Sequence, residues 1–134
     1  MSSTARPANG KSTGQSGQAT VEVAVLFPAL LLFLFGAVQV ALVSTARSVA
    51  TAAAEEGVRA GQAEGARPGA SAAAARVFLD QKAGGFLTST RISTAGSTDR
   101  VVRVSVSGRS LTVIPGRYRV SAQVHGPVER WSPP

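Results

Sequence analysis

The chain has 134 residues, of which 14 are basic and 7 are acidic, so its formal net charge is +7. This length leaves room for one modest domain beside a membrane segment. The absence of cysteine excludes disulfides, thiolate metal sites and cysteine nucleophiles. Twelve of the basic residues are arginines dispersed along the chain, a pattern more typical of solvated faces than of a nucleic-acid groove, so no nucleic-acid partner is expected.

Residues 1–17 are rich in small and polar residues and carry two positive charges, Arg6 and Lys11, with no negative charge. A segment of this kind buries too little apolar surface to fold, and we interpret it as a polar, basic leader. Its charges favour a cytoplasmic N-terminus, although Arg47 and Arg59 beyond the apolar run make the charge bias weak.

A long apolar run follows Glu22, and the next charged residue is Arg47. The charge-free stretch of 24 residues between them would be roughly 36 Å long as a helix, enough to cross a bilayer core of about 30 Å with some tilt. We therefore predict a transmembrane helix over residues 18–46. Cleavage after Gly17 would leave Gln18 as a new N-terminus, one helical turn from Glu22, and its ammonium group could neutralise that carboxylate.

Three residues mark the interior of this run. Pro28 is expected to kink the helix or end its first turns, and Gly36 continues the irregularity. Gln39 is the strongly polar side chain of the interior, and it could bond to a neighbouring helix or mark the outer interface. Two rival interpretations stay open: an uncleaved anchor, and a secretory signal peptide cut near Ala46, whose apolar region would be unusually long.

After the membrane run the helix pattern continues as a juxtamembrane extension over residues 47–66, because no proline intervenes before Pro68. Val43, Ala50 and Gly57 form a narrow stripe of small side chains, which fits contact with a sheet or helix or, alternatively, a solvated alanine-rich helix. The breaker cluster Gly61, Gly65, Pro68 and Gly69 ends the helix.

Residues 67–134 are predicted to form a small extracytoplasmic α+β domain with an irregular tail. Ser71 is expected to cap a second short helix, from Ala72 to about Ala83, with Val77 and Phe78 as its buried anchors. Alternating apolar residues then predict strands over residues 102–107 and 118–124, with Gly108 ending the first, and a weaker strand over 86–92. The fold class is α+β, with a small antiparallel sheet of about three strands covered on one face by helix.

No pattern in the sequence predicts catalysis or a cofactor. His125 is the single histidine, and it is interpreted as a surface or strand-end residue. The acidic residues Asp80, Asp99 and Glu129 are isolated along the chain, and the glycine spacings match neither a P-loop nor a dinucleotide fingerprint. We therefore expect a protein that is not an enzyme and that binds no cofactor and no metal.

The segment Gly17-Gln-Ala-Thr-Val-Glu22, followed by a long apolar helix, resembles the processing site of type IV prepilins. Together with Phe27-Pro28-Ala29 and Ala53-Ala54-Glu55-Glu56-Gly57, it resembles more specifically the TadE-like family of tight-adherence (Tad) pilus assembly proteins. The later segments 104–107, 113–116 and 120–122 resemble that family more loosely.

This resemblance implies a minor pilin or pseudopilin, a single-pass cell-membrane protein that a prepilin peptidase cuts after Gly17. Gly17 and Gln18 would form the processing site, and Glu22 would guide assembly. The implied partners are the membrane, the peptidase, other pilin or pseudopilin subunits and the Tad secretion platform. From the membrane the subunit could enter a surface pilus. The alternative is an exported envelope protein, released by signal-peptide cleavage near Ala46, with a basic binding domain.

Overall fold

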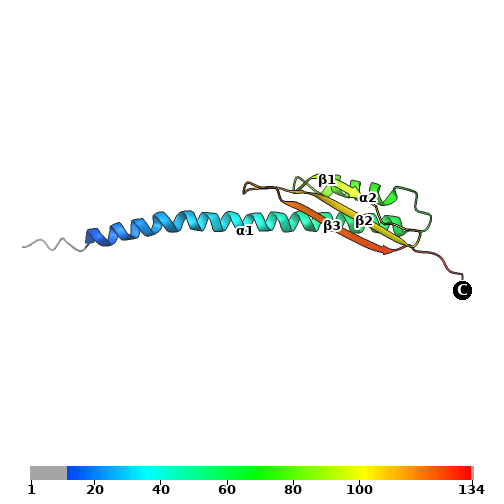
Figure 1. Cartoon of the computed structure of the whole chain (residues 1–134), viewed down its shortest axis with the longest axis horizontal. Coiled ribbons are helices and arrows are strands. Elements are labelled where there is room, and N and C mark those ends of the chain that lie inside the picture. Colours follow the sequence, from blue (N-terminus) through cyan, green and yellow to red (C-terminus); the bar gives the residue numbers. More distant parts are fainter. Residues whose placement is uncertain (1–11, 134) are drawn as a thin grey trace, which may run out of the picture. The chain divides into compact units, whose positions relative to one another are not determined.

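The computed structural model describes the backbone of residues 12–133 and the side chains from residue 17 onward. Helix α1 (Ser12–Gln62) is followed by helix α2 (Ala70–Lys82) and by strands β1 (Leu87–Ser93), β2 (Val101–Ser110) and β3 (Arg119–Pro127) (Figure 1). The chain divides into two compact units, residues 1–37 and 38–134. The predicted α+β class, with two helices and three strands, is confirmed.

Helix α1 is one uninterrupted element that passes through both Pro28 and Gly36. The expected continuation of the membrane helix into a juxtamembrane helix is therefore confirmed, although the helix ends at Gln62 and not at the predicted residue 66, and Pro28 does not end the helix. The helix also begins earlier than expected, at Ser12, because extending a formed helix adds a hydrogen bond for each residue without a new nucleation cost. Of the predicted leader, residues 1–11 lie outside the described residues.

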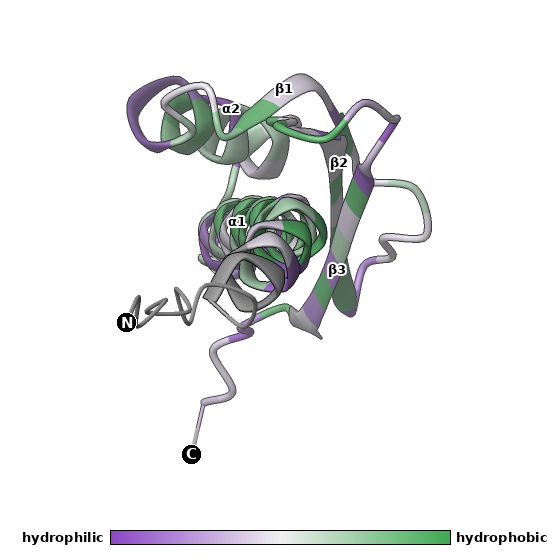
Figure 2. Ribbon diagram, turned by 90° about the vertical axis from the view of Figure 1, so that its left-hand side faces the viewer, coloured by the Kyte–Doolittle hydropathy of each residue, from purple (hydrophilic) through white to green (hydrophobic). Residues whose placement is uncertain are grey.

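In the second unit, both helices lie on one side of the sheet (Figure 2). The sheet is antiparallel with β2 in the centre, and β2 pairs with β1 through Ile92 and Val106 and with β3 through Val106 and Ala122. Small residues of α1 meet larger residues of the sheet, so the predicted stripe is a helix-on-sheet contact. The buried apolar residues are Ala46, Ala50, Ala53, Ala54, Val58, Ala75, Leu79, Ala83, Leu87, Val102, Val104, Val106 and Val120.

Two details of α2 differ from the expectation. Gly69, with a positive φ of 83°, is its N-cap residue, and no side chain caps the helix, so the predicted role of Ser71 is wrong. Val77 is 53% exposed, whereas Ala75 and Leu79 are the buried residues. The small Ala75 faces the core because α1 approaches closely: a Cβ on Gly57 would lie 3.3 Å from the Ala75 Cβ and 2.9 Å from the Ser71 carbonyl oxygen.

Gly108 does not end β2, which continues to Ser110. Gly108 pairs with Val120 of β3, and β1 has an irregular register beside it, between Thr88 and Arg91. A Cβ at position 108 would lie 2.8 Å from Cδ1 of Leu87 and from the carbonyl oxygen of Thr88. The glycine therefore makes room for the buried Leu87 instead of breaking the strand.

Candidate functional site

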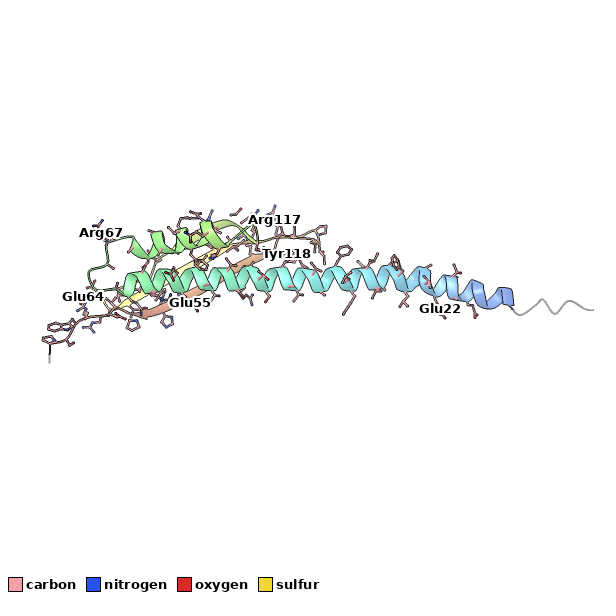
Figure 3. All side chains as sticks on the ribbon, turned by 180° about the vertical axis from the view of Figure 1, so that it is seen from behind. Glu22, Glu55, Glu64, Arg67, Arg117 and Tyr118 are labelled. Carbon is pink, nitrogen blue, oxygen red and sulfur yellow. The ribbon has the colours of Figure 1, made fainter. Side chains whose placement is uncertain are left out.

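The residues of the predicted processing site lie on the exposed surface of α1. Gly17 is inside the helix, and a Cβ built on it would meet nothing within 4 Å. Gln18 and Glu22 are also exposed, one helical turn apart. Glu22 (labelled in Figure 3) lies on α1, before the second unit in sequence and beside the exposed apolar side chains of Val21, Val25, Leu26 and Ala29. A peptidase that cuts between Gly17 and Gln18 would need access to these residues, and both are exposed.

Glu22 lies at the start of the charge-free run of α1. Among the described residues, the one ion pair is between Glu56 and Arg59, at 3.0 Å, so Glu22 has no ion-pair partner in that part of the chain. In the uncut chain the nitrogen of Gln18 belongs to an amide and carries no charge. Cleavage after Gly17 would create an ammonium group within reach of the Glu22 carboxylate.

From Gln18 to Ala37, α1 presents apolar side chains that the protein leaves uncovered. Every residue in this stretch of 20 is exposed except Gly36, which is half-buried, and Leu32 and Phe33 are 72% and 77% exposed. Exposed apolar area on this scale is unfavourable in water and favourable in lipid. Within the described residues, the segment Gly17–Gln62 is the one helix long and apolar enough to cross a membrane.

Gln39 makes hydrogen bonds within the domain that the sequence did not predict. Its side chain is only 5% exposed, and its Nε2 donates to the carbonyl oxygen of Leu111 at 3.2 Å. Its Oε1 accepts from the amides of Val113 at 2.9 Å and Ile114 at 3.2 Å. Gln39 therefore binds the β2–β3 loop within its own chain. The sequence indicated only that Gln39 is a strongly polar residue isolated in an apolar run. Its partners could not be inferred from the sequence, because they lie more than 70 positions away along the chain.

Gln62 forms the corresponding connection at the other end of the domain. Its Nε2 donates to the carbonyl oxygen of Pro127 at 2.8 Å, and its own carbonyl accepts from the amide of Glu129 at 3.1 Å. The tail beyond these contacts carries Trp131, which is 71% exposed and so does not pack on the sheet. His125 is exposed on β3.

The described structure thus combines a helix suited to membrane anchoring with a small α+β domain that includes the end of the same helix. Residues 17–59 match the model of the family described as TadE-like protein. The predicted resemblance is confirmed over this segment, which contains the candidate processing site and most of α1, and the match supports involvement in Tad pilus assembly. Searches of curated proteins and of solved structures gave no match.

Proposed function

We propose that this chain is a minor pilin or pseudopilin of a Tad or type IV-like pilus assembly and secretion system, cut by a prepilin peptidase after Gly17. The observation that carries the proposal is the exposed apolar stretch from Gln18 to Ala37, directly after Gly17 and within the TadE-like match. At about 1.5 Å per residue, these 20 residues are roughly 30 Å long, the thickness of a bilayer core. The same surface could later pack against other subunits.

In this proposal the N-terminus is cytoplasmic and the α+β domain is extracytoplasmic. The peptidase reaches Gly17 at the membrane surface, where a glycine lowers the cost of opening the helix by roughly 0.5–1 kcal/mol relative to alanine. The subunit then joins other pilin-like subunits on the Tad secretion platform. Glu22 directs this step by pairing with the amine of Gln18, in the same chain or in a neighbour.

The packing of Ala46 argues against the alternative of signal-peptide cleavage at that position. Ala46 is fully buried in the core and lies within α1. A cut after Ala46 would divide the helix and remove Gln39, with its three hydrogen bonds to the β2–β3 loop. The released domain would lose part of its own core.

The first prediction concerns cleavage. Gly17→Ala should leave the full-length chain in the membrane, because the proposed prepilin-type site has glycine before the cut and alanine raises the cost of opening the helix there by roughly 0.5–1 kcal/mol. Immunoblotting of the membrane fraction measures the ratio of full-length to shortened chain. Gly36→Ala is the matched control, since a Cβ there also meets nothing within 4 Å, and it should be processed normally. Complete processing of Gly17→Ala would contradict the proposed site.

The second prediction separates cleavage from assembly. Glu22→Ala should be cut normally but should enter pili or assembly complexes poorly, because the ammonium of Gln18 then lacks its partner at the membrane. Co-purification with other pilin subunits measures assembly, and the chain length measures cleavage. Glu64→Ala, a change at an exposed acidic residue of the other unit, is the control. Normal assembly of the Glu22 variant would remove the charge-pairing argument.

A further inference from the structure

The loop between β2 and β3, together with the strand residues that flank it, is basic and partly apolar. Residues 109–119, which include Arg109 and Ser110 of β2 and Arg119 of β3, read Arg-Ser-Leu-Thr-Val-Ile-Pro-Gly-Arg-Tyr-Arg, with three arginines, a tyrosine and no acidic residue. Leu111 and Val113 are 48% and 44% exposed. Exposed aliphatic side chains next to arginines and a tyrosine are typical of protein segments at a membrane interface.

The loop is fixed at a defined position along α1. Gln39 bonds to the backbone of Leu111, Val113 and Ile114, and the amide of Leu111 also donates to the carbonyl oxygen of Phe86 at 3.2 Å. Phe86 is itself 40% exposed. The apolar loop is therefore held beside Gln39. Gln39 comes two residues after the end of the exposed stretch at Ala37.

The length of the exposed stretch indicates where Gln39 would lie if α1 crosses a bilayer. Counting about 20 residues back from Gln39 spans the bilayer core of about 30 Å and ends near Thr20. Gln18 and Glu22 then lie at one interface when Gln39 lies at the other. Because Gln39 comes two residues after the exposed stretch ends, the chain itself keeps Gln39 and the loop bound to it close to the bilayer surface at which that stretch would emerge.

The arginines beside the loop lack acidic partners on their own sheet. Arg109 of β2 and Arg119 of β3 are directly opposite each other, and Arg91 of β1 is paired with Ser107 in the neighbouring row. Like charges directly opposite each other are destabilising, and the three strands contain no Asp or Glu. Together with Ser89, Ser107 and Ser121, these arginines line a hollow of about 440 Å³.

We propose that this end of the domain docks on an anionic phospholipid surface, with Leu111 and Val113 in the interfacial layer and Arg109, Arg117 and Arg119 on lipid phosphates. Arg117 and Tyr118 lie at the opposite end of the domain from Glu64 and Arg67 (Figure 3). The contact would hold the domain against the membrane until the subunit is taken up for assembly. The inference rests on α1 crossing the membrane, and it does not require cleavage at Gly17.

The chain has no cysteine, so a single introduced cysteine carries a fluorophore at one chosen position of the full chain. In phosphatidylcholine vesicles containing phosphatidylglycerol, nitroxide-labelled lipids should quench a probe at Val113→Cys. They should also quench a probe at Leu32→Cys in the anchor, but not one at Ala95→Cys in the exposed turn between β1 and β2. If the Leu32 probe is quenched and the Val113 probe is not, like the Ala95 probe, the docking proposal is overturned but the membrane anchor is not. An unquenched Leu32 probe would overturn the anchor and with it this inference.

The arginines are tested in the same vesicles. Arg109→Gln/Arg119→Gln should lower the ratio of docked to undocked domain by roughly fivefold for each arginine removed, and the effect should vanish in vesicles of phosphatidylcholine alone. The control Arg67→Gln/Arg100→Gln removes the same charge from exposed positions at the other end. Equal losses in the two double variants would contradict a specific role for the arginine pair.

Inorganic phosphate and polyphosphate distinguish a lipid surface from a soluble anion. The full chain in neutral detergent is titrated with each, and the probe at Val113 should not respond when lipid is absent. The proposal would be overturned by two results together: polyphosphate binds tightly and Arg109→Gln/Arg119→Gln abolishes that binding, while lipid does not quench the Val113 probe. The arginines would then bind a soluble polyanion.

Discussion

Two glutamines hold the domain together at the scale of single residues. Gln39 and Gln62 lie near the two ends of the part of α1 that belongs to the domain, and each bonds to backbone that is distant in sequence. A glutamine suits this purpose because its amide both donates and accepts. The two contacts connect α1 with the segments on either side of β3.

Gln39→Leu tests the first of these contacts. The change keeps the size and apolar environment but leaves the amides of Val113 and Ile114 without their acceptor, which should cost about 1–3 kcal/mol of local stability. Hydrogen exchange of the loop peptide in the full chain measures the effect as faster exchange. Gln123→Leu, at an exposed position of β3, should leave the loop unchanged. Equal protection in the parent and Gln39→Leu would contradict the role of Gln39.

At the scale of elements, α1 packs on the sheet through small residues. Ala46, Ala50, Ala53 and Ala54 are fully buried, and a Cβ on Gly57 would lie 3.1 Å from Cγ1 of Val104. Alanine and glycine bring the helix backbone close to the sheet, and the largest fully buried side chains are the sheet valines Val104, Val106 and Val120. The domain is therefore sensitive to added volume on this face of α1.

Gly57→Val should destabilise the domain by about 1–3 kcal/mol, because its branched side chain would press on the backbone of Ser71 as well as on Val104. Thermal unfolding of the full chain in detergent, followed by circular dichroism, measures the shift in Tm. Gly36→Val adds the same atoms to α1 in open space and should leave the unfolding of the domain unchanged. A Tm for Gly57→Val at or above that of the parent would rule out tight packing here.

The sequence predicted the elements better than it predicted their contacts. Periodicity found α1, α2 and the three strands because helix and strand patterns are local properties. Gln39 acts on the β2–β3 loop and Gly108 makes room for Leu87. Both partners are distant in sequence, so no local pattern could predict either role. The cap of α2 was missed because Ser71 suits that position chemically, whereas Gly69 has the left-handed backbone that the turn requires.

The candidate site was predictable for a different reason. Gly17, Gln18 and Glu22 are adjacent along one helix, so their spacing in sequence is also their spacing in space. The basic hollow on the sheet joins Arg91, Arg109 and Arg119 from three strands, and only the register of the sheet brings these residues together.

At the scale of the whole molecule, one helix serves two purposes. Its exposed first part is suited to the membrane, and its last part, from residue 38, contributes to the core of the domain. Helix α1 therefore contributes residues to both the anchor and the domain, and processing after Gly17 would shorten the chain without removing the exposed apolar stretch or any residue of the core. A cut at Ala46 would damage both.

The N-terminus of the chain in the membrane fraction tests the proposed function most directly. Intact mass spectrometry should find a chain that starts at Gln18, with a free or methylated amine able to pair with Glu22. A mature chain that starts at Arg47 would contradict the account in favour of an exported domain, and a chain that retains residues 1–17 in cells that process other pilins would contradict cleavage. Quantitative pyroglutamate at Gln18 would leave the cut site standing but remove the charge pair.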